Sequence, residues 1–159
     1  MGGRKLVVVF AAAVMLLAAV PASGAEVTPQ EYKERVEPIC QANKSKEEIL
    51  RTVRREVKEG KLKIASRHMA TAAKALKQTY GKLLNVPKPT EDAARLTKWL
   101  KGIKTEAELL EAAGRKLGKG EKNAALKMVV RLKTNAVKTN NLVLDYEFRY
   151  CHVDPSKFI

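Results

Sequence analysis

Apolar residues recur at spacings of three and four along most of the chain after residue 26. The longest regular series consists of Ala93, Leu96, Leu100, Ile103, Ala107, Leu110, Gly114 and Leu117. Such spacing places the apolar side chains on one face of a helix. Similar series occupy 36–57, where the middle is polar, 62–83, and 125–142, where the spacing is less regular. The pattern predicts four amphipathic helices.

Glycine and proline mark the connections between these helices. Gly60 separates the first from the second, the segment 85–89 separates the second from the third, and the segment 117–120 separates the third from the fourth. Pro38 predicts a kink or a break, because proline cannot donate a helical hydrogen bond. We therefore expect helices at approximately 29–59 with a break near 38, 61–84, 91–117 and 121–145, followed by a tail at 146–159.

Short connections make consecutive helices antiparallel. The predicted fold is therefore all-α, an antiparallel up-down-up-down four-helix bundle. Composition supports it, since aromatic residues make up only 5% of the chain and the dominant alanine, leucine, lysine and glutamate favour helix. Residues 26–159 are long enough to form a single domain with its own core.

The N-terminal segment 1–25 has the three parts of a cleavable signal peptide. Arg4 and Lys5 come first, an almost unbroken apolar run occupies 6–20, and small residues end the segment at Ala25. The alternative is a retained membrane anchor, but roughly 20 apolar residues are needed to span a bilayer. We expect cleavage after residue 25 and a secreted or extracytoplasmic protein, with no spanning segment after cleavage.

The chain contains two cysteines, Cys40 and Cys151. In an oxidising compartment they allow one intramolecular disulfide, and a redox pair is disfavoured because redox cysteines are normally found close together as Cys-x-x-Cys. In the predicted bundle both residues lie at the same end, so we expect a structural bridge there. The aromatic residues of the tail are expected to fold over this end: Tyr146, Phe148, Tyr150 and Phe158.

Three segments resemble those of a group of small exported bacterial helical proteins. These segments are 31–40 (EYKERVEPIC), the Trp99–Leu100 pair and 140–151 (NNLVLDYEFRYC). The group has one long-range disulfide, an aromatic C-terminal tail and no assigned function. The resemblance implies a bacterial, exported setting and implies no chemistry.

No pattern in the chain indicates catalysis, a cofactor or a metal. His68 and His152 are expected at opposite ends of the bundle, on the order of 25 Å apart, too far to share an ion. His68 is expected at the surface. Ser45, Ser66 and Ser156 have no recognisable nucleophile context. We therefore expect a protein that is not an enzyme.

Four polar residues fall on or beside the predicted helix interfaces: Asn43, Asn135, Thr139 and Asn140. They either line a small polar pocket or fix the register between helices by bonding to one another. The second reading is the more common one for such residues.

Charge is the strongest remaining feature. The chain carries a net charge of +14, and removal of 1–25 takes away two positive charges and leaves +12. The predicted turns at Gly60 and 118–120 lie at one end of the bundle. That end gathers ten basic residues, to which we refer as the basic pole: Arg54, Arg55, Lys58, Lys61, Lys63, Arg67, Arg115, Lys116, Lys119 and Lys122. The opposite end is acidic, with Glu31, Glu34, Glu37, Glu91, Asp92, Asp145, Glu147 and Asp154.

Helix dipoles account for part of this polarity, because acids favour helix starts and bases favour helix ends. They do not account for the basic residues expected at helix starts, namely Lys61, Lys63, Lys119 and Lys122. We expect an exported, non-catalytic helical protein with a structural or protein-interaction role in the cell envelope or extracellular space. The alternative is an electrostatic binder of anionic cell-wall polymer, polysaccharide, lipid headgroup or extracellular DNA through the basic pole, and a third reading is that the charge only keeps the protein soluble.

Overall fold

The computed structural model describes residues 26–42 and 47–154, and the predicted signal peptide lies outside these residues. Within them the chain is all-α, as predicted, and contains no strand. The elements are α1 (Pro29–Gln41), α2 (Glu47–Lys58), α3 (Leu62–Leu84), α4 (Ala93–Gly118), α5 (Lys122–Asn141) and the short 3-10 helix η2 (Leu144–Tyr146).

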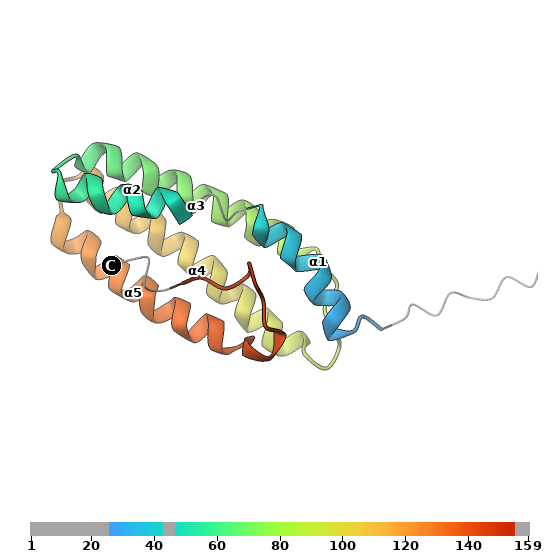
Figure 1. Cartoon of the computed structure of the whole chain (residues 1–159). Coiled ribbons are helices and arrows are strands. Elements are labelled where there is room, and N and C mark those ends of the chain that lie inside the picture. Colours follow the sequence, from blue (N-terminus) through green and yellow to red (C-terminus); the bar gives the residue numbers. More distant parts are fainter. Residues whose placement is uncertain (1–25, 43–46, 155–159) are drawn as a thin grey trace, which may run out of the picture.

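The helices pack mainly in chain order: α2 on α3, α3 on α4, and α4 on α5. Figure 1 shows α1 and α2 following one another along α3, so that together they take the place of the first predicted helix. A regular four-helix bundle is closed by contacts between its first and last helices. In the described ranges α2 and α5 both contribute to the second core cluster but are not a principal packing pair, so the structure shows an all-α fold of sequentially packed helices.

Helix α1 continues through Pro38 to Gln41, and α2 begins at Glu47. The break therefore comes after Pro38 and not at it. Tyr32, Val36 and Cys40 are all buried at spacings of four. Their packing holds the helical turn around the proline, and Pro38 itself lies exposed on the opposite side.

The α2–α3 and α4–α5 turns have the same geometry. Gly60 and Gly120 adopt φ values of 75° and 79°, the left-handed region that favours glycine. In each turn the amide after the glycine donates to the carbonyl five residues earlier, at 2.8 and 2.9 Å. These bonds form Schellman motifs, which satisfy the last carbonyls of α2 and α4. Both turns lie at the same end of the molecule (Figure 1).

The core is formed around α4. The apolar series predicted for this helix is buried from Leu96, which is fully buried, to Leu117, which is 3% exposed, and its first member, Ala93, is partly buried. One cluster at the α1 end includes Tyr32, Leu83 and Trp99, and a second cluster at the other end joins α2, α3, α4 and α5.

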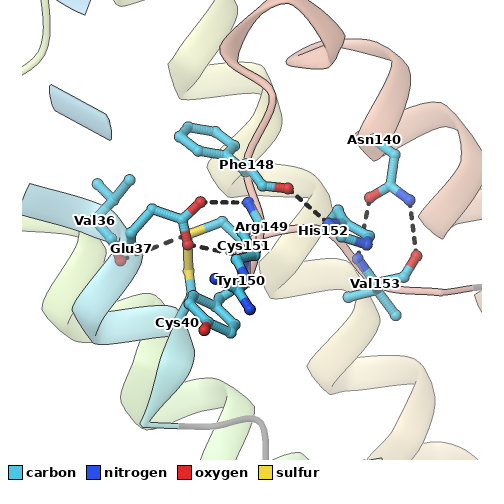
Figure 2. The surroundings of a disulfide bond; sticks show 10 residues. All are labelled: Val36, Glu37, Cys40, Asn140, Phe148, Arg149, Tyr150, Cys151, His152 and Val153. Atoms are coloured by element: carbon cyan, nitrogen blue, oxygen red, sulfur yellow. Dashed lines mark hydrogen bonds between the residues drawn. A yellow bond between two sulfur atoms is a disulfide. The ribbon is translucent and has the colours of Figure 1, made fainter. Parts of the chain in front are cut away.

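The predicted Cys40–Cys151 disulfide is present, with the two Cα atoms 5.0 Å apart. Figure 2 shows that the tail around it crosses from α5 to α1. On the α1 side the carboxylate of Glu37 accepts hydrogen bonds from the amides of Arg149 and Tyr150. These contacts attach the tail to the first helix beside the disulfide.

On the α5 side, the Asn140 side chain bonds both backbone groups of Val153, donating to the carbonyl at 2.7 Å and accepting from the amide at 3.3 Å (Figure 2). The tail is thus held between α1 and α5 at this end. Among the described residues these two helices are not a principal packing pair.

The aromatic cover expected over this end is formed by Tyr146 and Phe148, with Tyr150 partly buried against the same cluster. Phe148 stacks on Trp99 at 5.3 Å and on Tyr146 at 5.1 Å between ring centroids, and Tyr146 meets the ring edge of Tyr32 at 5.9 Å. Phe158 lies outside the described residues. The tail therefore completes the first core cluster.

Candidate functional site

The basic pole is built from two helix ends and two helix starts. Arg54, Arg55 and Lys58 come from the second half of α2, and Arg115 and Lys116 from the last turn of α4. The remaining five lie on or next to the turns and on α3, namely Lys61, Lys63, Arg67, Lys119 and Lys122. Residues 60–64 and 117–120 line one hollow of about 540 Å³ between the two turns.

Some of these cations already have anionic partners. Lys61 lies 2.8 Å from Glu59, and Lys116 lies 2.7 Å from Glu121. The hydrogen bonds from these lysines lower the pKa of both glutamates below the usual value. All four side chains are exposed, and such pairs contribute little to stability.

Lys63, Lys119 and Lys122 are among six cations of the basic pole that form no ion pair with any residue of the described ranges; the others are Arg55, Lys58 and Arg67. Lys63 and Lys122 lie in the first turns of α3 and α5, which contain no acid and have no side-chain cap. The helix dipole disfavours positive charge there. Lys119 is instead the C-cap of α4, where the dipole favours a cation, so the expectation that it lies at a helix start is wrong.

His68 lies at the surface in a half-buried position, with its side chain 39% exposed. Its Nδ1 lies 2.9 Å from Oε2 of Glu56 on α2, which is only 7% exposed. The pair connects α2 to α3 and removes Glu56 from the surface acids that offset the basic pole. His152 has separate surroundings, with Nδ1 2.8 Å from the carbonyl oxygen of Phe148. Among the residues that the structure describes, no three His, Cys, Asp or Glu side chains converge on a possible metal site.

A buried carboxyl group lies between α4 and α5. Glu106 is 1% exposed, and burial raises the pKa of its side chain to about 8. Asn135 donates to its Oε1 at 3.3 Å and to the carbonyl of Gly102 at 2.9 Å, whereas its Oε2 has no hydrogen-bond partner. The two helices approach closely because Gly102 has no Cβ; an added Cβ there would overlap the side chain of Thr139.

Sequence reasoning missed Glu106, because acids on amphipathic helices are normally read as surface charges. The sequence did contain a sign of this burial, because Glu106 lies between Ile103 and Ala107 of the regular apolar series of α4. Asn135 and Thr139 belong to this buried cluster, whereas Asn140 binds the tail. Asn43 lies outside the described residues. The polar positions that the structure describes therefore do not line one common pocket.

A groove separates α2 from α5 next to the basic pole, with a volume of about 330 Å³. Its walls are mainly apolar, and three residues of the basic pole, Arg54, Lys58 and Lys122, also line it. The α2 wall contributes Leu50, Val53 and Val57, and the α5 wall contributes Ala125, Leu126 and Val129. The sequence did not predict this groove, because a closed bundle would bring the two helices together.

The chain matches no protein-family model, no curated protein and no solved structure. Over 26–42 and 47–154, no helix combines the length and apolar character needed to cross a bilayer. The fold and surface define the class of molecule: an all-helical protein with one long-range disulfide, a basic pole and an apolar groove beside it.

Proposed function

We propose that this chain is a non-catalytic extracytoplasmic protein that binds an anionic partner through its basic pole. The observation that supports the proposal most directly is the meeting of the two glycine turns at one end, with Lys63, Lys119 and Lys122 free of ion pairs within the described chain. For Lys63 and Lys122 the fold itself supplies no reason for a positive charge.

The acidic end of the molecule contrasts with the basic pole. Its acids are used inside the fold: Glu37 binds tail amides, and Asp92 and Asp145 both bind Arg95. These three acids thus stabilise the structure, whereas Lys63, Lys119 and Lys122 form no ion pair within the described residues. This contrast favours binding over a general solubility role for the positive charge.

The disulfide supports an extracytoplasmic setting. A disulfide is typical of oxidising compartments, and the resemblance noted above suggests a bacterial envelope or extracellular location. The partner there is an anionic polymer or another envelope protein. Lysine presents a mobile point charge and not a bidentate fork, so we expect weakly selective binding that decreases with salt, since the screening length is about 10 Å at 0.1 M.

The test is retention of the disulfide-bonded protein on heparin, a model polyanion, in a salt gradient. The variant K63E/K119E/K122E should elute at clearly lower salt than the wild type. The matched control K82E/K98E/K101E makes the same change in net charge at exposed lysines that lie outside the basic pole, and should elute close to the wild type.

Two outcomes contradict the proposal. Equal loss of retention in both triple variants would mean that net charge alone governs binding and that there is no site. Unchanged retention of both would mean that the positive charge acts only in solubility. Thermal unfolding of each variant checks that the fold is retained.

A further inference from the structure

Helix α5 carries a second apolar row besides the face that packs on α4. Leu126, Val130 and Val137 are 55%, 50% and 44% exposed. Their spacings of four and seven place them on one side of the helix, over a length of roughly 17 Å. The buried residues of α5, Ala125 and Leu132 among them, lie on another side. Lys133 and Thr134 separate Val137 from Val130, so Leu126 and Val130 form the compact part of the row, next to the groove that Leu126 also lines.

This row is continuous with the groove between α2 and α5. Leu126 belongs to both, and Val129 beside it faces the groove together with Val53 and Val57 of α2. In the described chain these two helices are not a principal packing pair. Each therefore presents apolar side chains to the groove. The groove reaches Val129 on α5, and the exposed side chains of Val130 and Val137 lie beyond it on the same helix.

All charged residues of α5 are basic, because the helix contains no acid between Lys122 and Asn141. None of its basic residues forms an ion pair within the part of the chain that the structure describes. They flank the apolar row on both sides: Lys122, Lys127, Arg131, Lys133 and Lys138. On the opposite wall of the groove lie Arg54 and Lys58.

We propose that the groove between α2 and α5, together with the apolar row on α5, binds an acidic amphipathic helix of another polypeptide. The inference rests on the proposed function and names the chemistry of the partner. A helix is about 10 Å across and inserts an apolar stripe into a groove between two helices. Acids beside its stripe would meet the lysines beside the row, which gives charge complementarity on both flanks.

Other occupants fit the surface less well. A lipid bilayer is flat and cannot reach the recessed Val53 and Val57. A single acyl chain in the groove would leave Val130 and Val137 uncovered. A second copy would bring another α5 that is basic along its whole length, and like charges oppose that pairing.

The experiment uses a fluorescent synthetic peptide of about 18 residues, long enough to form a helix, with leucines at helical spacing and glutamates on both flanks. A scrambled peptide of identical composition has the same charge and no apolar stripe. We expect the full disulfide-bonded protein to bind the helical peptide about tenfold or more tightly than the scrambled one. Binding is measured by fluorescence anisotropy.

The variant L126S/V130S should lose about tenfold or more in affinity for the helical peptide. The control L84S/L144S removes two exposed apolar side chains that lie elsewhere, 46% and 68% exposed, and should bind like the wild type. A second variant, V130S/V137S, leaves the groove intact and should also bind more weakly. Circular dichroism checks folding, and all three variants should retain normal heparin elution.

Equal binding of the scrambled peptide would overturn the inference while leaving the proposed function intact, because charge alone would then suffice. The proposed function is tested separately, by comparing the heparin retention of the wild type with that of K63E/K119E/K122E. If L126S/V130S instead abolished binding to vesicles of anionic phospholipid without affecting the peptide, the surface would be a membrane site. If it abolished self-association measured by sedimentation, the occupant would be a second copy.

Discussion

The carboxyl group of Glu106 lies between α4 and α5, where only one of its oxygens has a hydrogen-bond partner. Burial disfavours the charged form, so the pKa rises from 4.5 to about 8. The folded state then holds a proton that the unfolded state releases above pH 4.5. The stabilisation linked to this proton is complete below pH 4.5 and is lost as the pH rises through 8. One residue thus ties the stability of the α4–α5 interface to pH.

Replacing Glu106 by glutamine should remove this dependence. We expect Glu106→Gln to be more stable than the wild type at pH 8 by up to about 4 kcal/mol, with a smaller difference at pH 4.5, because glutamine does not ionise. The measurement is urea denaturation at pH 4.5, 6 and 8. Glu108→Gln, an exposed position on the same helix, is the control and should follow the wild-type profile. An identical pH profile for Glu106→Gln and the wild type would show that Glu106 ionises normally.

At the scale of elements, the helices differ in how much of their surface the fold uses. The seam of α4 is buried along its length because α3 and α5 pack against it. Helix α5 packs on α4 alone among its principal contacts, so a second apolar row remains exposed. The two glycine turns, in contrast, are alike: the same hydrogen-bond pattern holds Gly60 and Gly120 in the same left-handed conformation.

Two glycine substitutions should change stability in opposite directions. Gly60→Ala should destabilise the protein by about 1–2 kcal/mol, because alanine is strained at a φ of 75°. Gly81→Ala should stabilise it by about 0.5–1 kcal/mol, because Gly81 lies inside α3 and a Cβ there meets no atom within 4 Å. Chemical denaturation of both variants checks the pair. Destabilisation by Gly81→Ala, or a neutral Gly60→Ala, would contradict the helix and turn assignments.

For the whole molecule, the disulfide and the tail replace contacts that a closed bundle would make between its first and last helices. Cys40 and Cys151 are 111 residues apart, and the tail between α5 and Cys151 is bound by side chains of α1 and α5. The disulfide and these hydrogen bonds therefore cross-link the molecule at its acidic end. At the basic end, α2 and α5 are left apart by the groove.

Reduction of the disulfide should lower the thermal midpoint while the helices persist. A closed loop of this length is worth up to about 4–5 kcal/mol on the chain-entropy model, and Trp99, Tyr146 and Phe148 still pack at this end without it. Circular dichroism melting with and without reductant, and thiol labelling of the native protein, test this. An unchanged midpoint, or two thiols that label without reductant, would argue against a stabilising bridge.

Much of the architecture was predictable because it depends on local patterns. Spacings of three and four predicted the helices, and glycine predicted the turns at Gly60 and Gly120, since few other residues adopt positive φ. The first helix ends at Gln41, a little after Pro38. Burial of Val36 and Cys40 on either side outweighs the hydrogen bond that the proline cannot donate.

The sequence by itself determined the all-helical class, the regular seam of α4 and the pairing of two cysteines that have no other partner. Only the tertiary structure decided that Glu106 is buried, that Lys119 ends a helix, and that α2 and α5 enclose a groove beside an exposed apolar row. The physical reason is one of range. Helical periodicity and turn geometry depend on neighbours within a few residues, whereas burial and grooves depend on how closely helices distant in sequence approach one another.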